Sequence, residues 1–228
     1  MTKGVFITGT DTGIGKTCVA RLLVRELKER GYRCAAMKPV ASGATLVNGQ
    51  LCNDDALQLI KESGLDLSYP IVNPYVFEPP IAPHIAAEQA QTQIDLDEIK
   101  SRYQELAKQA DWVVVEGVGG WCVPLGPDYT TADLAVRLKL PVVLVVGLRL
   151  GCLNHALLTA AQINACGGRL LGWVANSVDP GFDFMEQNIV TLRERLPAPL
   201  LGRLTFSGYD VLDANRRVLD LQTLLDGC

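Results

Sequence analysis

The sequence predicts an α/β fold in which a mostly parallel sheet carries helices on both faces. Short and strongly apolar runs alternate along the chain with longer segments of helical periodicity. Strands that are apolar throughout are typical of parallel sheets, because crossover helices cover both faces of such a sheet. Polar residues stand at the ends of several of these runs. Right-handed crossovers bring those ends to one edge of the sheet, where ligands bind in folds of this class.

The predicted elements follow one another in regular order. Apolar runs predict strands at residues 5–7, 34–37, 112–115, 142–146, 170–175 and 200–204. Helices are predicted near residues 15–30, 55–61, 96–109, 131–138, 154–165, 184–195 and 209–225. The Pro-rich stretch 69–83 is the longest predicted irregular segment, and its length favours a functional loop over a plain connection. We find no linker, repeat or low-complexity segment, so we expect one domain over residues 1–228.

The composition argues against several classes of partner. The net charge is −4 and no Lys/Arg cluster occurs, so we expect neither nucleic acid nor an anionic membrane as a partner. A strand begins directly after Gly4, which leaves no room for a signal peptide, and no apolar run approaches membrane-spanning length. The seven cysteines are scattered and include no C-x-x-C pair, so we expect reduced thiols in a cytoplasmic protein.

The segment 9–17 reads Gly-Thr-Asp-Thr-Gly-Ile-Gly-Lys-Thr and is the most informative stretch of the chain. It lies between a predicted strand and a predicted helix, which is the context that a phosphate-binding loop requires. Glycines let backbone N–H groups converge on phosphate oxygens, Lys16 can reach the terminal phosphates, and the Thr17 hydroxyl can ligate Mg²⁺. Thr10 stands where the strict pattern has its first glycine, and Gly9 lies one residue too early. The alternative is a glycine-rich turn with an incidental lysine, but the order of strand, turn and helix favours binding of ATP or GTP.

Further polar residues stand at or near predicted strand ends. Glu116 ends an apolar run and resembles the acidic element that holds Mg²⁺ in phosphate-loop enzymes. Lys38 stands at another strand end, where it either neutralises a transferring phosphate or is an ordinary surface lysine. In the run Asn53-Asp54-Asp55, we expect Asp54 to cap a helix and Asp55 to point at the metal.

Several segments together form a specific set of motifs. These are Gly-Thr-Asp-Thr-Gly-Ile-Gly-Lys-Thr (9–17), Lys-Pro-Val-Ala-Ser-Gly (38–43), Asn-Asp-Asp-Ala (53–56), Val-Asn-Pro-Tyr (72–75), Pro-His-Ile-Ala (83–86), Val-Glu-Gly-Val-Gly-Gly-Trp (115–121), Leu-Gly-Cys-Leu-Asn-His-Ala (150–156) and Gly-Trp-Val-Ala-Asn (172–176). In this order they resemble the dethiobiotin synthetase family, whose members are ATP-dependent enzymes of biotin synthesis. The resemblance runs over nearly the whole chain and implies a fold like that of the P-loop NTPases. A phosphate loop with one extra residue before Gly-Lys-Thr is itself typical of the family.

The resemblance implies one reaction and its participants. Carbon dioxide and 7,8-diaminopelargonic acid form a carbamate, ATP phosphorylates the carbamate to a mixed anhydride, and the second amine closes a ureido ring. ADP and phosphate are released, and Mg²⁺ is the expected metal ion. Phosphoryl transfer of this kind depends on positioning and charge neutralisation more than on covalent groups.

The resemblance also implies roles for individual residues. Lys38, Lys16 and Thr12 are the implied catalytic residues, and Thr17, Asp55 and Glu116 are the implied metal ligands. The implied nucleotide site consists of Gly13, Ile14, Gly15, Lys16, Thr17, Cys18, Asp55, Glu116, Gly117, Val118, Gly119, Asn176, Ser177, Thr205, Phe206 and Ser207. The implied substrate site consists of Thr12, Lys38, Ser42, Gly151, Cys152, Leu153 and Asn154. In the family the segment 151–154 comes from the other subunit of a homodimer and holds the distant carboxylate at a helix N-terminus. The chain departs from the family pattern at Gly13, Thr205 and Leu212.

Two other interpretations share the fold. A partitioning-type ATPase switch carries an early loop lysine where this chain has Asp11. Some of these switches end in a basic membrane-binding helix, whereas the tail 211–225 mixes arginine with aspartate. The amide-forming synthetases of corrin biosynthesis need a glutaminase domain, for which this chain is too short.

Overall fold

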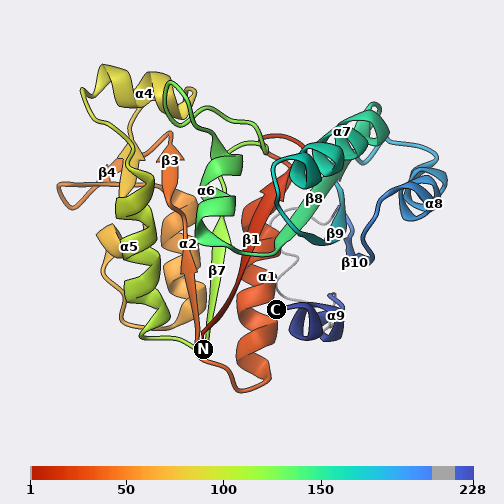
Figure 1. Cartoon of the computed structure of the whole chain (residues 1–228), viewed down its shortest axis with the longest axis horizontal. Coiled ribbons are helices and arrows are strands. Elements are labelled where there is room, and N and C mark those ends of the chain that lie inside the picture. Colours follow the sequence, from red (N-terminus) through yellow and green to blue (C-terminus); the bar gives the residue numbers. More distant parts are fainter. Residues whose placement is uncertain (1, 207–218) are drawn as a thin grey trace.

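The computed structural model describes residues 2–206 and 219–228, and it is built around a six-stranded parallel sheet (Figure 1). The strand order is β10-β9-β8-β1-β7-β2, so the first strand of the chain lies inside the sheet. The strands are β1 (Lys3–Gly9), β2 (Cys34–Met37), β7 (Trp112–Glu116), β8 (Val142–Leu148), β9 (Leu170–Ser177) and β10 (Leu200–Leu204). All neighbouring pairs in this sheet are parallel, which confirms the predicted fold class and all six predicted strands.

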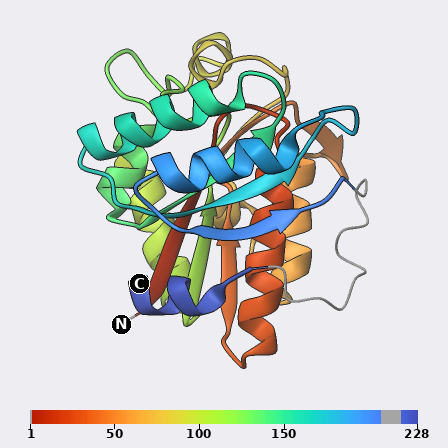
Figure 2. The same cartoon turned by 90° about the vertical axis from the view of Figure 1, so that its right-hand side faces the viewer.

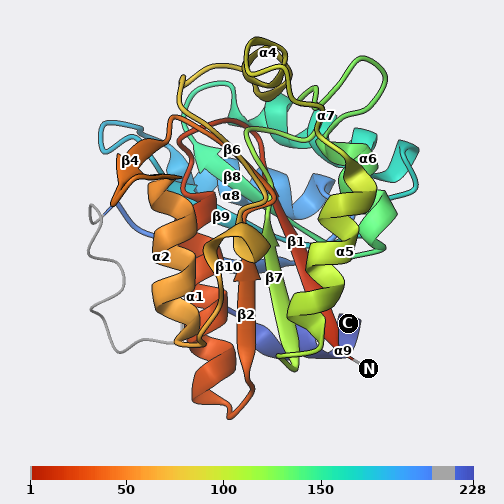
Figure 3. The same cartoon turned by 90° about the vertical axis from the view of Figure 1, so that its left-hand side faces the viewer.

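Side chains alternate between the two faces of the sheet and bury both. In β1, Val5 and Ile7 face one core and Phe6 faces the other, as the two-residue period of a strand requires. The first core is covered by α1 (Lys16–Glu29), α2 (Asp54–Ser63) and α9 (Leu221–Gly227). The opposite face is covered by α5 (Leu96–Ala107), α6 (Thr131–Leu138), α7 (Cys152–Ala165) and α8 (Met185–Arg195). Figure 2 shows α7 and α8 side by side on their face, and Figure 3 shows α1 and α2 on one side of the sheet and α5 on the other.

The stretch 40–89 holds short elements that the sequence did not predict. Strands β3 (Val40–Ser42) and β6 (Tyr75–Phe77) form a parallel pair, and β4 (Thr45–Val47) and β5 (Gln50–Cys52) form a hairpin. The helices α3 (Tyr69–Val72) and α4 (Pro83–Gln89) add one or two turns each. The expectation of an irregular segment over 69–83 was therefore wrong. Elements of three or four residues are too short to show a period, and proline in the first helical turn lacks only an N–H that has no partner there.

Of the predicted helix 209–225, only residues 219–225 are described, and helix α9 (Leu221–Gly227) begins among them. Helix α9 starts at Leu221, where the Asp220 carboxylate accepts hydrogen bonds from the backbone N–H groups of Gln222 and Thr223. Most of the predicted helix 209–225 lies outside the described residues. No helix of the described part is long and apolar enough to cross a membrane. All seven cysteines fall within the described residues and are free thiols.

Candidate active site

The phosphate-loop segment connects β1 to α1 and is shaped by glycines in the left-handed region. Gly13 has φ +73° and Gly15 has φ +88°, a conformation that other residues rarely adopt. A Cβ atom on Gly15 would lie 2.3 Å from Nδ2 of Asn176, so a side chain there would clash. Lys16 lies over the loop, and its Nζ donates a hydrogen bond to the Asp11 carbonyl at 2.7 Å. The loop is therefore a tight turn that carries a buried lysine at the start of α1.

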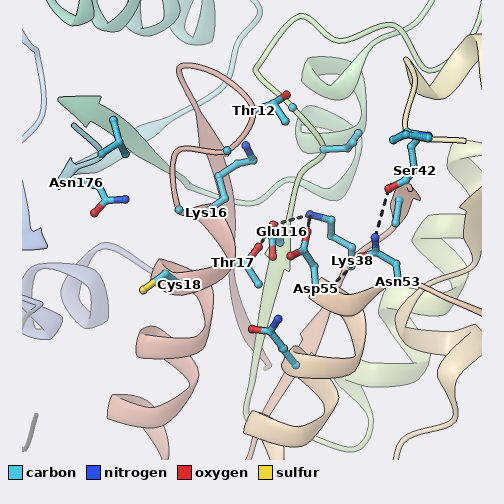
Figure 4. A pocket seen from close by; sticks show the side chains of 18 of the residues that line it. Thr12, Lys16, Thr17, Cys18, Lys38, Ser42, Asn53, Asp55, Glu116 and Asn176 are labelled. Carbon is cyan, nitrogen blue, oxygen red and sulfur yellow. Dashed lines mark hydrogen bonds and ion pairs between the residues drawn. The ribbon is translucent and has the colours of Figure 1, made fainter. Parts of the chain in front are cut away.

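The side chain of Lys38 lies between the carboxylates of Asp55 and Glu116 (Figure 4). Nζ of Lys38 lies 2.5 Å from Oε1 of Glu116 and 3.0 Å from Oδ2 of Asp55. Lys38 follows β2, Glu116 ends β7, and Asp55 lies in the first turn of α2. The parallel sheet thus brings three distant segments to one edge, as the sequence predicted. Lys38 is only 4% exposed, which excludes the alternative of a surface lysine.

Burial and mutual charge set the ionisation of this cluster. Burial alone would lower the pKa of Lys38, but the Glu116 and Asp55 carboxylates outweigh it and raise that pKa. Burial raises the pKa of Glu116, and the Lys38 ammonium opposes that shift. Burial and the neighbouring Lys38 charge lower the pKa of Lys16 to about 8. The two lysines therefore differ: the carboxylates keep the pKa of Lys38 high, whereas the pKa of Lys16 is lowered.

The oxygen atoms around Glu116 fit a magnesium ion. The Thr17 hydroxyl donates to Oε1 of Glu116 at 2.9 Å, whereas Oε2 of Glu116 is buried without a hydrogen-bond partner in the described structure. Asp55 supplies a second carboxylate on the same side of the cluster. No group of three His, Cys, Asp or Glu residues able to hold a metal was found among residues 2–206 and 219–228. Mg²⁺ usually takes one or two protein carboxylates and completes its shell with water and substrate phosphates, so the carboxylates of Glu116 and Asp55 are enough in number to hold one.

The loop and the lysine cluster open into one cavity of about 880 Å³. Most of the sequence-predicted site residues line it: Thr12, Gly13, Gly15, Lys16, Thr17, Cys18, Lys38, Ser42, Asp55, Glu116, Val118, Gly119, Asn176, Ser177, Thr205 and Phe206. The same cavity is also lined by residues that the sequence reasoning did not assign to the site: Arg21, Ala41, Asn53, Gln58, Val123, Val178 and the segment 80–83. Arg21 and Gln58 hydrogen-bond each other, and their places on α1 and α2, one turn after Thr17 and Asp55, are the signal that could have found them.

Other predicted site residues do not line the cavity. The Ile14 side chain is buried, and a Cβ atom on Gly117 would lie 2.9 Å from the Phe6 ring; neither residue lines the cavity. The segment 151–154 also lies off the cavity lining. Ser207 falls outside the described residues.

Asn176 supports the phosphate loop in this structure. Its Nδ2 donates to the Ile14 carbonyl at 2.7 Å, and its side chain packs against Gly15. Figure 4 shows it across the loop from Lys38. Reading of the adenine edge by Asn176 stays a prediction.

The helix cap at α2 differs from the expected one. Asn53, not Asp54, is the N-cap residue, and its Oδ1 accepts hydrogen bonds from the N–H groups of Asp55 and Ala56. An N-cap side chain accepts hydrogen bonds from the N–H groups of the second and third helical residues. Because the helix begins at Asp54, the residue in the N-cap position is Asn53. The Asp54 side chain is exposed, whereas Asp55 turns to Lys38 as expected.

The segment 151–154 begins helix α7 next to an apolar outer surface. Gly151 has φ +94° and Cys152 is buried in the core, while Asn154 is exposed. Leu158, one helical turn after Asn154, is 62% exposed, and Leu150, which precedes the N-cap of α7, is 91% exposed. Arg149, just before this segment, forms an ion pair with Asp11 of the phosphate loop.

Comparison with known proteins places the chain in a family. The chain is 48% identical to the ATP-dependent dethiobiotin synthetase of Cellvibrio japonicus over 227 residues, 98% of each chain. It is 52% identical to that of Pseudomonas paraeruginosa over 200 residues, 87% of this chain and 88% of the relative. The chain belongs to the dethiobiotin synthetase family. A dethiobiotin synthetase of Escherichia coli O157:H7 is 48% identical over 202 residues, 89% of this chain and 90% of the relative. A family model described as an AAA domain matches residues 3–207.

Solved structures place this dethiobiotin synthetase family member in the P-loop NTPase fold. The cell division protein MinD of Aquifex aeolicus aligns with a TM-score of 0.58 and 13% identity, over 93% of this chain and 85% of that one. A ParA family ATPase from Chlorobium tepidum TLS aligns with a TM-score of 0.57 and 14% identity, over 100% and 98%. At such identities the likeness concerns the fold alone.

Proposed function

We propose that this chain is an ATP-dependent dethiobiotin synthetase of biotin biosynthesis, acting as one domain over residues 1–228. The observation that carries the proposal is Lys38 held between Asp55 and Glu116, beside Lys16 and the phosphate loop in one cavity. The family relatives, 48–52% identical, bear the same activity in their names. The proposed substrates are 7,8-diaminopelargonic acid, CO₂ and ATP.

In the proposed reaction, one amine first attacks CO₂ and loses a proton to give the carbamate, and two further bond-forming steps follow. A carbamate oxygen, formed from CO₂ and one amine, attacks the γ-phosphorus of ATP, and the bond to the β-phosphate oxygen breaks to release ADP. The second amine then attacks the carbonyl carbon of the mixed anhydride, loses a proton, and expels phosphate as the ureido ring closes. Charge concentrates on the phosphoryl group while it passes between two anions.

Lys16 and Lys38 are placed to stabilise the negative charge on the transferring phosphoryl group. Lys16 lies on the loop side of the cavity and Lys38 on the opposite side of Glu116 (Figure 4). A fixed cation in a partly water-excluded site stabilises developing negative charge without reorganisation. Thr12 and Ser42 line the same cavity, and the buried Ser42 hydroxyl has no hydrogen-bond partner in the described structure, so it is free to bond the carbamate.

Magnesium is the proposed metal ion, held by Thr17, Asp55 and Glu116. When bound, it supplies charge neutralisation to the phosphate oxygens. The buried and unpartnered Oε2 of Glu116 supports this assignment.

A homodimer is the proposed assembly. The substrate is charged at both ends, and the segment 151–154 does not line the cavity of its own chain. The exposed Leu150 and Leu158 around Asn154 suit a subunit contact that would carry this segment to the partner's cavity. We also propose that the enzyme works in the cytoplasm, where its seven free thiols stay reduced.

The partitioning-type switch receives no support from the site. The position of its early loop lysine is Asp11, which is engaged by Arg149. One experiment separates the two functions. ADP release by the purified chain with Mg²⁺ should require both diaminopelargonic acid and bicarbonate. Fast ATP hydrolysis without them, or stimulation by membrane or DNA, would contradict the synthetase proposal.

A further inference from the structure

The motif Val-Asn-Pro-Tyr (72–75) has no role in the chemistry described above, yet it holds the backbone of Lys38. The Lys38 N–H donates to the Val72 carbonyl at 2.9 Å, and the Lys38 carbonyl accepts from Nδ2 of Asn73 at 2.7 Å. Lys38 follows the last residue of β2, where the ladder of the main sheet ends. Buried backbone groups need partners, and here the motif supplies both of them.

Asn73 is fully engaged and almost completely buried. It is 1% exposed, and its Nδ2 also donates to the Tyr75 carbonyl at 3.1 Å. Its Oδ1 accepts a hydrogen bond from the Tyr69 hydroxyl at 2.7 Å. Both amide protons and the amide oxygen are therefore used, which fixes the side chain in one orientation.

Tyr69 links this segment to the start of α2. Its hydroxyl accepts from the N–H of Asn53 at 2.8 Å while it donates to Asn73. Asn53 caps α2 through the N–H of Asp55, and its Nδ2 donates to the Ser42 carbonyl at 3.3 Å (Figure 4). The hydroxyl thus sits between the residue that caps α2 and the residue that holds Lys38.

These contacts close a ring. It runs from the Lys38 carbonyl through Asn73, Tyr69 and Asn53 to Asp55, and it closes where Asp55 meets Nζ of Lys38 at 3.0 Å. We propose that Asn73 and Tyr69 are positioning residues, which fix the distance between Lys38 and Asp55 for phosphoryl transfer. This inference rests on the proposed function and assigns to it two residues that do not line the cavity.

Tyr69→Phe is the sharpest test, because it removes the hydroxyl and keeps the ring in place. The matched control is Tyr129→Phe, which removes a 2.6 Å hydrogen bond to the Ile94 carbonyl away from the cavity. Small displacements of catalytic groups have large effects on rate, so we expect Tyr69→Phe to lower kcat roughly tenfold. It should also raise the Mg²⁺ concentration for half-maximal rate, and leave the Kd for ADP without Mg²⁺ unchanged. The control should change none of the three.

A double-mutant cycle that combines Tyr69→Phe with Asp55→Asn distinguishes a role in positioning Asp55 from a general loss of stability. In the Asp55→Asn background the charge that closes the ring is absent, so adding Tyr69→Phe should lower kcat less than twofold. Equal losses in both backgrounds, or a Tyr69→Phe enzyme that matches the Tyr129→Phe control, would overturn the inference. Failure of the proposed function would look different, because the unmodified protein would then lack diamine-dependent ADP release.

Discussion

Lys38 is the residue on which the proposed chemistry depends most. Its ammonium is buried between Glu116 and Asp55. We expect Lys38→Gln to lower kcat roughly 10²- to 10³-fold, because one preorganised contact to transition-state charge is lost. Lys61→Gln, an exposed lysine near the end of α2, is the control and should keep full turnover. Steady-state ADP release measures both, and near-normal turnover of Lys38→Gln would remove this lysine from the mechanism.

The acids near Lys38 are expected to differ sharply. Glu116→Gln and Asp55→Asn should each raise the Mg²⁺ concentration for half-maximal rate, since each removes one of the two charges that face the proposed ion. Asp54→Asn should be close to neutral, because the Asp54 side chain is exposed and Asn53 is the cap. The measurement is the rate of ADP release by each of the three variants as a function of Mg²⁺ concentration. Damage by Asp54→Asn alone would show that the metal assignment is off by one residue.

The thiols should fall into two reactivity classes. Burial raises the pKa of Cys34 to about 12, so at pH 8 only about 10⁻⁴ of this thiol is ionised. We expect a disulfide reagent to label the exposed Cys122 rapidly in the native protein and Cys34 only after unfolding. Mass spectrometry of peptides taken at successive labelling times shows the order in which the cysteines react. Native labelling of Cys34 as fast as Cys122 would contradict its burial in the sheet.

At the scale of elements, the N-terminus of α2 contributes both to the stability of the fold and to the proposed catalysis. Asn53→Ala and Asp95→Ala each remove an N-cap, from α2 and from α5, and should each lower the free energy of unfolding by about 1 kcal/mol. Only Asn53→Ala should also lower kcat, because Asn53 positions Asp55 whereas Asp95 lies far from the cavity. Urea unfolding gives the free energy of unfolding of both variants, and steady-state ADP release gives their kcat. An equal effect on kcat would mean that catalysis follows stability alone.

The long elements were predictable from the sequence because each has a clear local pattern. β7 and β8 are long apolar runs, and β7 ends in the charged Glu116, so this strand end and a site residue could be predicted together. The pair β3–β6 and helix α3 are three or four residues long and owe their form to contacts between distant segments. For the same reason, the link from Asn73 to Lys38, 35 residues apart, could not be inferred from any local pattern.

At the scale of the whole molecule, the proposed homodimer makes a complementation test possible. A Lys16→Gln protein lacks the loop cation, and an Asn154 variant lacks the proposed contact to the substrate tail. Neither should turn over well alone, but mixing them should restore part of the activity, since a hybrid dimer holds one intact site. No recovery after verified subunit exchange would mean that each site is built within one chain.

The identity of the product tests the central claim most directly. The purified chain is incubated with ATP, Mg²⁺, diaminopelargonic acid and ¹³C-labelled bicarbonate, and the product is analysed by mass spectrometry. We predict dethiobiotin with the label in the ureido carbonyl, formed in equal amount to ADP, and far less of it with Lys38→Gln. ADP formed without labelled dethiobiotin would contradict the account.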